Sequence, residues 1–182
     1  GSIRQETKRV GGGRDNRGAA AFVPPPHEIV GELMTDLCEV INTDELPAVV
    51  HAALIHAQFE TIQPFADGNG RTGRALINVV LRRRGLVSRA APPISLVLAT
   101  EANQYIGGLT EFRYIGAPES ATARGGFNRW VATFASAARR SATRAAEFET
   151  QIEVIQAKWR LALGKVRGDS AVDRLVVALP GA

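Results

Sequence analysis

Apolar residues recur every three or four positions over most of this chain, which is the spacing of helices that bury one face. A first stretch, residues 29–41, has an apolar residue at every fourth position. A second, residues 49–59, is apolar on nearly every side, so we expect it in the middle of a bundle. A third runs from residue 71 to residue 84 and ends at a glycine. The pattern predicts a helical bundle.

The second half of the chain is predicted to be largely helical as well. Residues 94–100 fit a strand or a buried helical turn, and their helical surroundings favour a helix. We expect Gly107 and Gly108, and the segment 116–126, to be irregular. An Ala- and Arg-rich pattern then predicts a long helix over residues 127–159.

The N-terminal residues differ from the rest. Residues 3–23 are rich in Gly and Arg around two short strand-capable pieces, which predicts a mobile β-hairpin. Three prolines then end strand pairing, because each lacks the N–H that a ladder needs. The leading Gly-Ser resembles the scar of a cleaved tag. We therefore divide the chain into a tag remnant with the hairpin (1–23), a helical core (24–165) and an unassigned C-terminal extension (166–182).

The composition narrows the class of protein. With 182 residues and 45% hydrophobic content, the chain is sized for one globular domain. It has neither a run of about 18 apolar residues nor a secretory signal pattern, so we expect no membrane partner and a cytoplasmic location. Its single cysteine, Cys38, lies among apolar residues and is expected in the core. The net charge of +4 comes with scattered arginines, which does not favour nucleic acid as a partner.

The segment between the second and third predicted helices carries the candidate chemistry. From position 63 to position 74 it reads Gln-Pro-Phe-Ala-Asp-Gly-Asn-Gly-Arg-Thr-Gly-Arg. Gly68 and Gly70 allow a sharp turn that brings backbone N–H groups close to a ligand, and the next helix N-terminus favours anions. Arg71 and Arg74 project from one face of that helix and can bind separate phosphate oxygens. The pattern predicts a phosphate-binding corner.

A carboxylate in such a corner indicates a metal ion. Asp67 would repel a polyphosphate unless Mg²⁺ lay between them, and Mg²⁺ takes one or two carboxylates together with phosphate oxygens. The segment lacks the Gly-Lys-Ser/Thr of a Walker A loop, and a helix precedes it where a dinucleotide fingerprint has a strand. An ATP-like ligand with Mg²⁺ is the natural expectation.

The same twelve residues resemble the signature of the Fic family, His-Pro-Phe-x-Asp/Glu-Gly-Asn-Gly-Arg-x-x-Arg, at all but one of its specified positions. Residues 57–62 resemble the usual lead-in to that signature, and residues 21–26 resemble the family's Tyr-Val-Pro-Pro-Pro segment. Arg4 with residues 10–12 resembles its flap hairpin. The resemblance covers residues 3–160.

This resemblance implies an all-α Fic fold, a helical bundle with a small β-hairpin flap. A Fic domain of this kind binds Mg-ATP and transfers AMP to a Ser, Thr or Tyr hydroxyl of a target protein, docked here along residues 4–22. By position, Asp67 would hold Mg²⁺ and Phe65 would anchor the loop in the core. The implied nucleotide-binding residues are Gly68, Asn69, Gly70, Arg71 and Arg74, with Asn69 also among the catalytic positions.

Gln63 stands where the family has its general-base histidine. A carboxamide can accept a hydrogen bond from a hydroxyl but cannot take its proton, so we expect nucleotide binding with AMP transfer close to abolished. Three explanations stay open: a substitution introduced on purpose, a chain that binds without transferring, and a scaffold that runs another reaction. His56, on an apolar helix, is interpreted as structural.

Many Fic proteins carry an inhibitory helix with the pattern Ser/Thr-x-x-x-Glu-Gly/Asn. Residues 143–147 have the spacing, but Phe148 follows where Gly or Asn is expected. We therefore expect any inhibitory segment in a preceding part of the protein, on a partner antitoxin, or nowhere.

Overall fold

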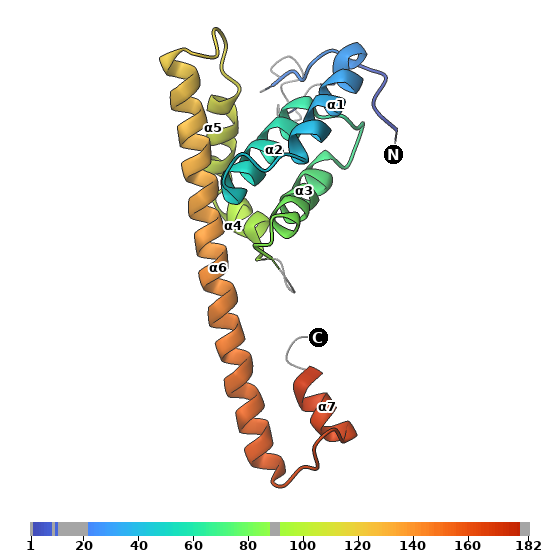
Figure 1. The fold of residues 1–182 in the computed structure, drawn as a ribbon, viewed down its shortest axis with the longest axis vertical. Coiled ribbons are helices and arrows are strands. Elements are labelled where there is room, and N and C mark those ends of the chain that lie inside the picture. Colours follow the sequence, from blue (N-terminus) through green and yellow to red (C-terminus); the bar gives the residue numbers. More distant parts are fainter. Residues whose placement is uncertain (1, 9, 11–21, 88–91, 179–182) are drawn as a thin grey trace, which may run out of the picture. The chain divides into compact units, whose positions relative to one another are not determined.

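The computed structural model describes residues 2–8, 10, 22–87 and 92–178, and these residues form an almost entirely helical fold (Figure 1). The elements in chain order are the 3-10 helix η1 (His27–Ile29), α1 (Val30–Ile41), α2 (Ala48–Ile62), α3 (Asn69–Arg83), α4 (Ile94–Thr100), α5 (Ala102–Phe112), α6 (Ala121–Leu163) and α7 (Ala171–Ala178). The predicted all-α class is confirmed. Among the described residues, no helix is both long and apolar enough to cross a bilayer.

Helix α2 is buried on nearly all sides, as its sequence predicts. It packs against both α1 and α3 (Figure 1). Ile55, Phe59 and Ile62 of α2 are each about 1% exposed, and burying one such side chain contributes about 1.5–3 kcal/mol. Because the candidate loop joins α2 to α3, the packing of these two helices fixes both ends of the loop.

Helix α1 covers one side of α2 with a single apolar face. Val30 and Leu37 are buried on that face, while Leu33 and Met34 pack against the core at its margin. Cys38 is exposed, so its predicted place in the core is wrong. It follows Leu37 directly, and the rotation of about 100° per residue carries it to the outer face.

Close helix packing uses glycines that the sequence analysis assigned to irregular segments. Gly107 and Gly108 lie inside α5, so the predicted irregularity there is wrong. A Cβ on Gly108 would lie 3.1 Å from the ring of Trp130, a fully buried residue of α6. Gly126 also lies inside α6, where a Cβ would overlap the carbonyl group of Glu111. Gly108 and Gly126 therefore make room for a neighbouring helix, whereas a Cβ on Gly107 would meet nothing within 4 Å.

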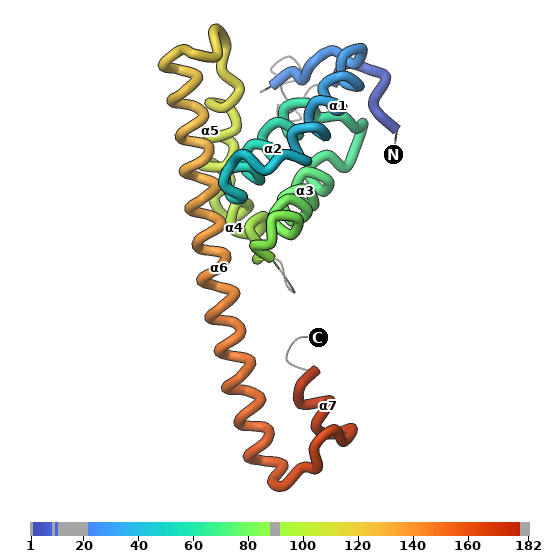
Figure 2. Tube along the Cα trace, in the orientation of Figure 1, coloured from blue at the N-terminus to red at the C-terminus, as the bar shows by residue number. Residues whose placement is uncertain are grey.

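The chain divides into two compact units, residues 1–138 and residues 139–182. In the second unit, α7 folds back beside the last turns of α6 (Figure 2), where Gln156 Nε2 donates a hydrogen bond to Val177 O at 3.2 Å. The functional division predicted at residues 23 and 165 stays a prediction, since these units are defined by contacts alone.

The predicted hairpin is described only at its base. Val10 and Phe22 exchange two backbone hydrogen bonds of 2.9 and 3.1 Å, and residues 11–21 lie outside the described part. A second isolated bridge pairs Ile3 with Phe65 of the candidate loop. The N-terminal segment therefore runs antiparallel to the loop.

Candidate functional site

The loop between α2 and α3 has left-handed backbone at both ends. It begins at Gln63, with a φ of 49°, and ends at Gly68, with a φ of 85°. This conformation costs a residue with a side chain about 1–2 kcal/mol, whereas glycine adopts it readily. Gln63 N–H donates to Phe59 O at 2.9 Å and thereby closes α2. The backbone is therefore strained at Gln63, where α2 ends, and unstrained at Gly68, where α3 starts.

Asn69, the first residue of α3, fastens the middle of the loop. Its Oδ1 accepts a hydrogen bond from Phe65 N–H at 2.9 Å, and its Nδ2 donates to Phe65 O at 2.7 Å. The Phe65 ring packs against the core beside Phe59, with ring centroids 6.1 Å apart. Phe65 thus lies where the resemblance implies. Both polar atoms of the Asn69 side chain are therefore used within the loop.

Two cations from the N-terminal segment bind the carbonyl groups of the loop. Arg4 is 5% exposed, and its guanidinium donates to the carbonyls of residues 62–63. Its backbone N–H donates to Pro64 O at 2.9 Å. Lys8 Nζ donates to the carbonyls of residues 65–66, at 3.2 and 3.0 Å. Every one of these carbonyls has a donor, and positive charge lies at the negative end of the α2 dipole.

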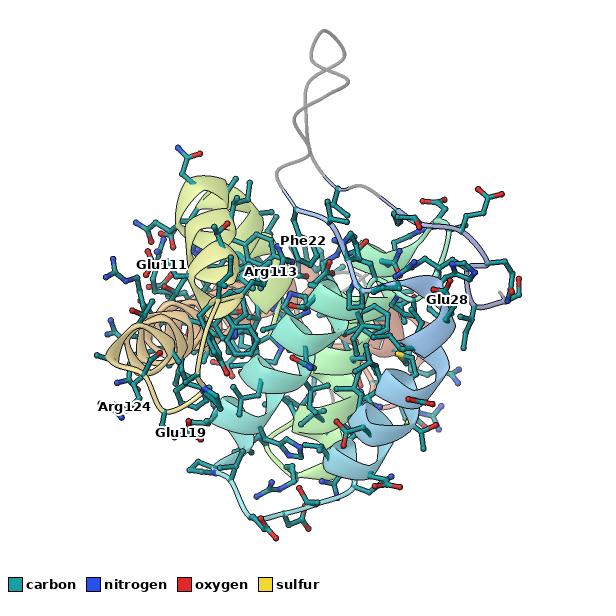
Figure 3. The ribbon with its side chains drawn as sticks, turned by 90° about the horizontal axis from the view of Figure 1, so that it is seen from above. Phe22, Glu28, Glu111, Arg113, Glu119 and Arg124 are labelled. Carbon is teal, nitrogen blue, oxygen red and sulfur yellow. The ribbon has the colours of Figure 1, made fainter. Side chains whose placement is uncertain are left out.

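A third cation reaches the same helix end from the end of α5. Arg113 Nη2 donates to Glu60 O at 2.9 Å, and Arg113 Nε donates to Thr61 Oγ1 at 3.2 Å. The guanidinium also lies 4.0 Å from the ring centroid of Phe22, a cation–π contact at the base of the hairpin (Figure 3). Burial lowers the pKa of Arg113 from its ordinary value. The end of α2 is therefore held by both the N-terminal segment and α5.

The first turn of α3 presents backbone donors. The first bond into this helix runs from Thr72 N–H to Gly68 O at 3.0 Å. The N–H groups of Asn69, Gly70 and Arg71 consequently have no acceptor within the helix. They form the positive end of its dipole. The corner predicted from the sequence is thus a helix start whose first N–H groups have no helical acceptor.

Two arginines extend this positive surface. Arg71 Nη2 lies 3.4 Å from Asp67 Oδ2, and both side chains are largely exposed, so this pair contributes little to stability. Arg74 makes no ion pair or hydrogen bond with any residue that the structure describes. Its Nη1 lies over Gly70, where a Cβ would meet it at 3.1 Å. The structure brings both guanidinium groups to the predicted corner.

Asp67 is the candidate metal ligand. Its side chain is 96% exposed and is therefore open to a ligand. Within residues 2–8, 10, 22–87 and 92–178, no three His, Cys, Asp or Glu side chains gather in a way that would hold a metal ion. Mg²⁺ that is bound by one carboxylate, phosphate oxygens and water needs no such group. Asp67 fits a metal that arrives with a nucleotide.

The side chain of Gln63 turns back toward α2. Its Nε2 donates to Glu60 O at 3.2 Å and to Glu60 Oε2 at 2.7 Å. Glu60 is 8% exposed, and burial raises the pKa of its carboxyl, against the opposing charges of Arg113 and other cations. The residue at the histidine position of the Fic signature is thus held by an acid one helical turn earlier.

His56 belongs to the core, as the sequence predicts. Its Nδ1 lies 3.0 Å from Gly73 O and therefore carries the proton, which leaves Nε2 to accept from Tyr105 at 3.1 Å. The ring also stacks on Trp130, with centroids 6.1 Å apart. Burial lowers the pKa of His56 to about 4. Because both ring nitrogens are bound within the protein, His56 is no substitute for a base at position 63.

Sequence reasoning missed Lys8, Arg113 and Glu60, and it assigned Arg4 to the flap alone. Arg4, Lys8 and Arg113 donate to carbonyls between 53 and 59 residues away, so no local pattern identifies them. Glu60 had a detectable signal, because a residue three positions before Gln63 lies on the same face of a helix.

Comparison with known proteins supports the same family. Residues 1–81 match the Fic/DOC family. A probable protein adenylyltransferase of Aquifex aeolicus is 40% identical over 72 residues, which are 39% of this chain and 22% of that protein. Protein adenylyltransferase fic-1 of Caenorhabditis elegans is 33% identical over 87 residues, which are 46% of this chain and 16% of that protein. This chain thus spans less than a quarter of either adenylyltransferase.

A solved structure shares the fold. The crystal structure of a Fic family protein from Desulfovibrio desulfuricans G20 aligns with a TM-score of 0.58 over 97% of this chain and 50% of its own. The two sequences are 22% identical, so this likeness concerns the fold alone.

His56 should make the fold acid-sensitive. Its folded pKa lies below the ordinary 6.5, so the unfolded chain binds a proton between pH 6.5 and pH 4 that the folded chain does not. The free energy of unfolding should therefore fall as the pH drops through this window, by about 3 kcal/mol in all. Urea denaturation of the unchanged chain and of His56→Gln isolates this contribution. Identical pH dependence in the two proteins would contradict it.

Proposed function

From the match of residues 1–81 to the Fic/DOC family, we propose that this chain binds Mg-ATP at the start of α3, on a scaffold for AMP transfer to a protein hydroxyl. The relatives named above are a probable and a named protein adenylyltransferase, and the family match over residues 1–81 includes the α2–α3 loop. Gln63 makes the transfer itself strongly reduced or absent in this form.

The observation that carries the proposal is the arrangement of donors at the start of α3. The loop carbonyls are bound by Arg4 and Lys8, while the N–H groups of the first turn of α3 have no helical acceptor. Arg74 is exposed and unpaired among the described residues. A polyphosphate supplies the anionic oxygens that these donors lack.

In the proposed reaction a target hydroxyl attacks the α-phosphorus of ATP and pyrophosphate leaves. The N–H groups of Gly68, Asn69 and Gly70 would stabilise charge on the α- and β-phosphates. Arg71 would contact the phosphates and Arg74 would reach the γ-phosphate. Asp67 would hold Mg²⁺, which neutralises phosphate charge when bound.

Proton removal is the step that this site lacks. Gln63 can orient a hydroxyl through its amide oxygen, but a carboxamide binds no proton at useful pH. Loss of a general base reduces a rate by about 10²- to 10⁴-fold. Nucleotide binding is independent of that step and should be retained.

The partners follow from the same family. We propose that a target protein docks along residues 4–22, since the base of the hairpin lies against Arg113, which follows α5 and contacts the end of α2. An antitoxin or a preceding part of the protein would supply any inhibition.

A second candidate function is a non-catalytic nucleotide-binding or partner-docking module. It is favoured by the side chain of Gln63, whose nitrogen is already engaged by Glu60. A Fic scaffold that runs a different reaction, without a base at position 63, would use the same phosphate corner.

Arg74→Ala should weaken the binding of Mg-ATP about 10- to 100-fold, because a hydrogen bond to a charged group contributes roughly 1.5–3 kcal/mol. Isothermal titration calorimetry measures this change. Arg144→Ala, which removes an exposed arginine of α6, should leave the affinity unchanged. Equal affinities of Arg74→Ala and the unchanged chain would contradict the proposed site.

Gln63→His should raise AMP transfer about 10²- to 10⁴-fold, because it supplies a general base. Incubation with α-labelled ATP and Mg²⁺ shows this as label on the protein itself or on proteins of a lysate. Gln63→Asn, which adds no base, should stay inactive. If Gln63→His binds ATP but labels nothing, the non-catalytic module replaces the transferase.

A further inference from the structure

The carboxyl group of Glu60 is held in one place between α2 and α3. Its Oε2 accepts from Gln63 Nε2 at 2.7 Å. Its Oε1 lies so close to Gly73 of α3 that a Cβ there would approach it to 2.6 Å. The main-chain carbonyl of Glu60 accepts from Arg113 at 2.9 Å. Neither the backbone nor the side chain of Glu60 has much freedom to move.

This geometry determines which way the Gln63 amide faces. Both acceptors of Nε2 belong to Glu60, and an oxygen in place of Nε2 would face the Glu60 carbonyl with no hydrogen to share. Gln63 Oε1 accepts no hydrogen bond from the described residues, and it is not among the enclosed polar atoms that lack a partner. Oε1 therefore reaches the surface of the loop and is the polar atom that position 63 offers to a ligand.

Charged and titratable groups surround the Glu60 carboxyl from every packed element. They are Arg113 after α5, Tyr105 of α5, Arg74 of α3, Lys8 of the N-terminal segment and His56 of α2. The three cations favour the ionised carboxylate. Burial opposes them and is the larger effect, so the pKa of Glu60 is raised.

We propose that Glu60 is a positioning residue for the side chain at position 63. In this chain it binds the amide nitrogen of Gln63, so that Oε1 faces an incoming hydroxyl as an acceptor. An imidazole at the same position would donate from one ring nitrogen to Glu60, and its other nitrogen would be left to accept the hydroxyl proton. This catalytic consequence rests on the proposed function, whereas the positioning contact does not.

The first test uses the unchanged chain and ¹⁵N NMR of its side-chain amides. The Gln63 resonances are identified by their loss in Gln63→His. They should shift with pH in one step, with a midpoint above the usual glutamate range, because Nε2 senses the ionisation of Glu60. The step should vanish in Glu60→Gln and persist in Asp44→Asn, which removes a carboxylate paired with Arg83 before the start of α2.

A Gln63 amide that shows no pH-dependent step overturns the proposal, and so does an unchanged step in Glu60→Gln. The measurement on the unchanged chain is decisive by itself if Glu60→Gln fails to fold.

The second test compares Gln63→His with the double variant Gln63→His and Glu60→Gln. A neighbouring carboxylate raises the pKa of an imidazole, so the NMR titration midpoint of the introduced ring should lie about one pH unit lower in the double variant. Where Gln63→His restores transfer, the rising limb of its kcat-against-pH profile should move by the same amount in the double variant. The kcat of the double variant should also be about tenfold or more lower. Equal midpoints overturn the proposal.

The two hypotheses fail in different ways. The imidazole titration needs no turnover, so the expected midpoint shift without any AMP transfer would refute the proposed function and support the positioning role. AMP transfer with equal titration midpoints in the two variants would support the proposed function and refute the positioning role.

Discussion

Cations placed against the C-terminal end of α2 are the interaction on which the candidate site depends. The last carbonyls of a helix have no helical donor and carry the negative end of its dipole. Here Arg4, Lys8 and Arg113 supply donors to that end and to the loop that follows it. A buried carbonyl without a partner costs about 1–3 kcal/mol, so these contacts allow α2 to end inside the protein.

The capping also separates donors from acceptors in the α2–α3 corner. The carbonyls of residues 63–66 accept from the N-terminal segment or Asn69, and the backbone has a left-handed conformation at Gly68. The start of α3 is then left with N–H groups that nothing in the helix satisfies. The backbone of this corner therefore offers donors rather than acceptors, which is the arrangement that the proposed phosphate site requires. The left-handed backbone of Gln63 is kept because the capped helix end holds it on both sides.

The sequence predicted the helices, the all-α class and the place of the corner, because these depend on local periodicity and on a contiguous motif. The errors lie where tertiary contacts override local pattern. Gly108 reads as a break, yet it is the place where Trp130 packs on α5. Cys38 reads as core, yet it lies one residue beyond the buried face of α1. Arg113 and Lys8 could not be found, since their acceptors are more than 50 residues away. The chemical roles of the corner residues stay predictions.

The most direct test is to follow the backbone amide resonances of Asn69, Gly70 and Arg71 by ¹H–¹⁵N NMR while Mg-ATP is added. The account predicts large, saturable downfield shifts of these three amides, since each would donate to a phosphate oxygen, with little change at residues 63–66, whose carbonyls are capped. Unchanged resonances in this turn at saturating nucleotide, or binding that shifts only other regions, would contradict it.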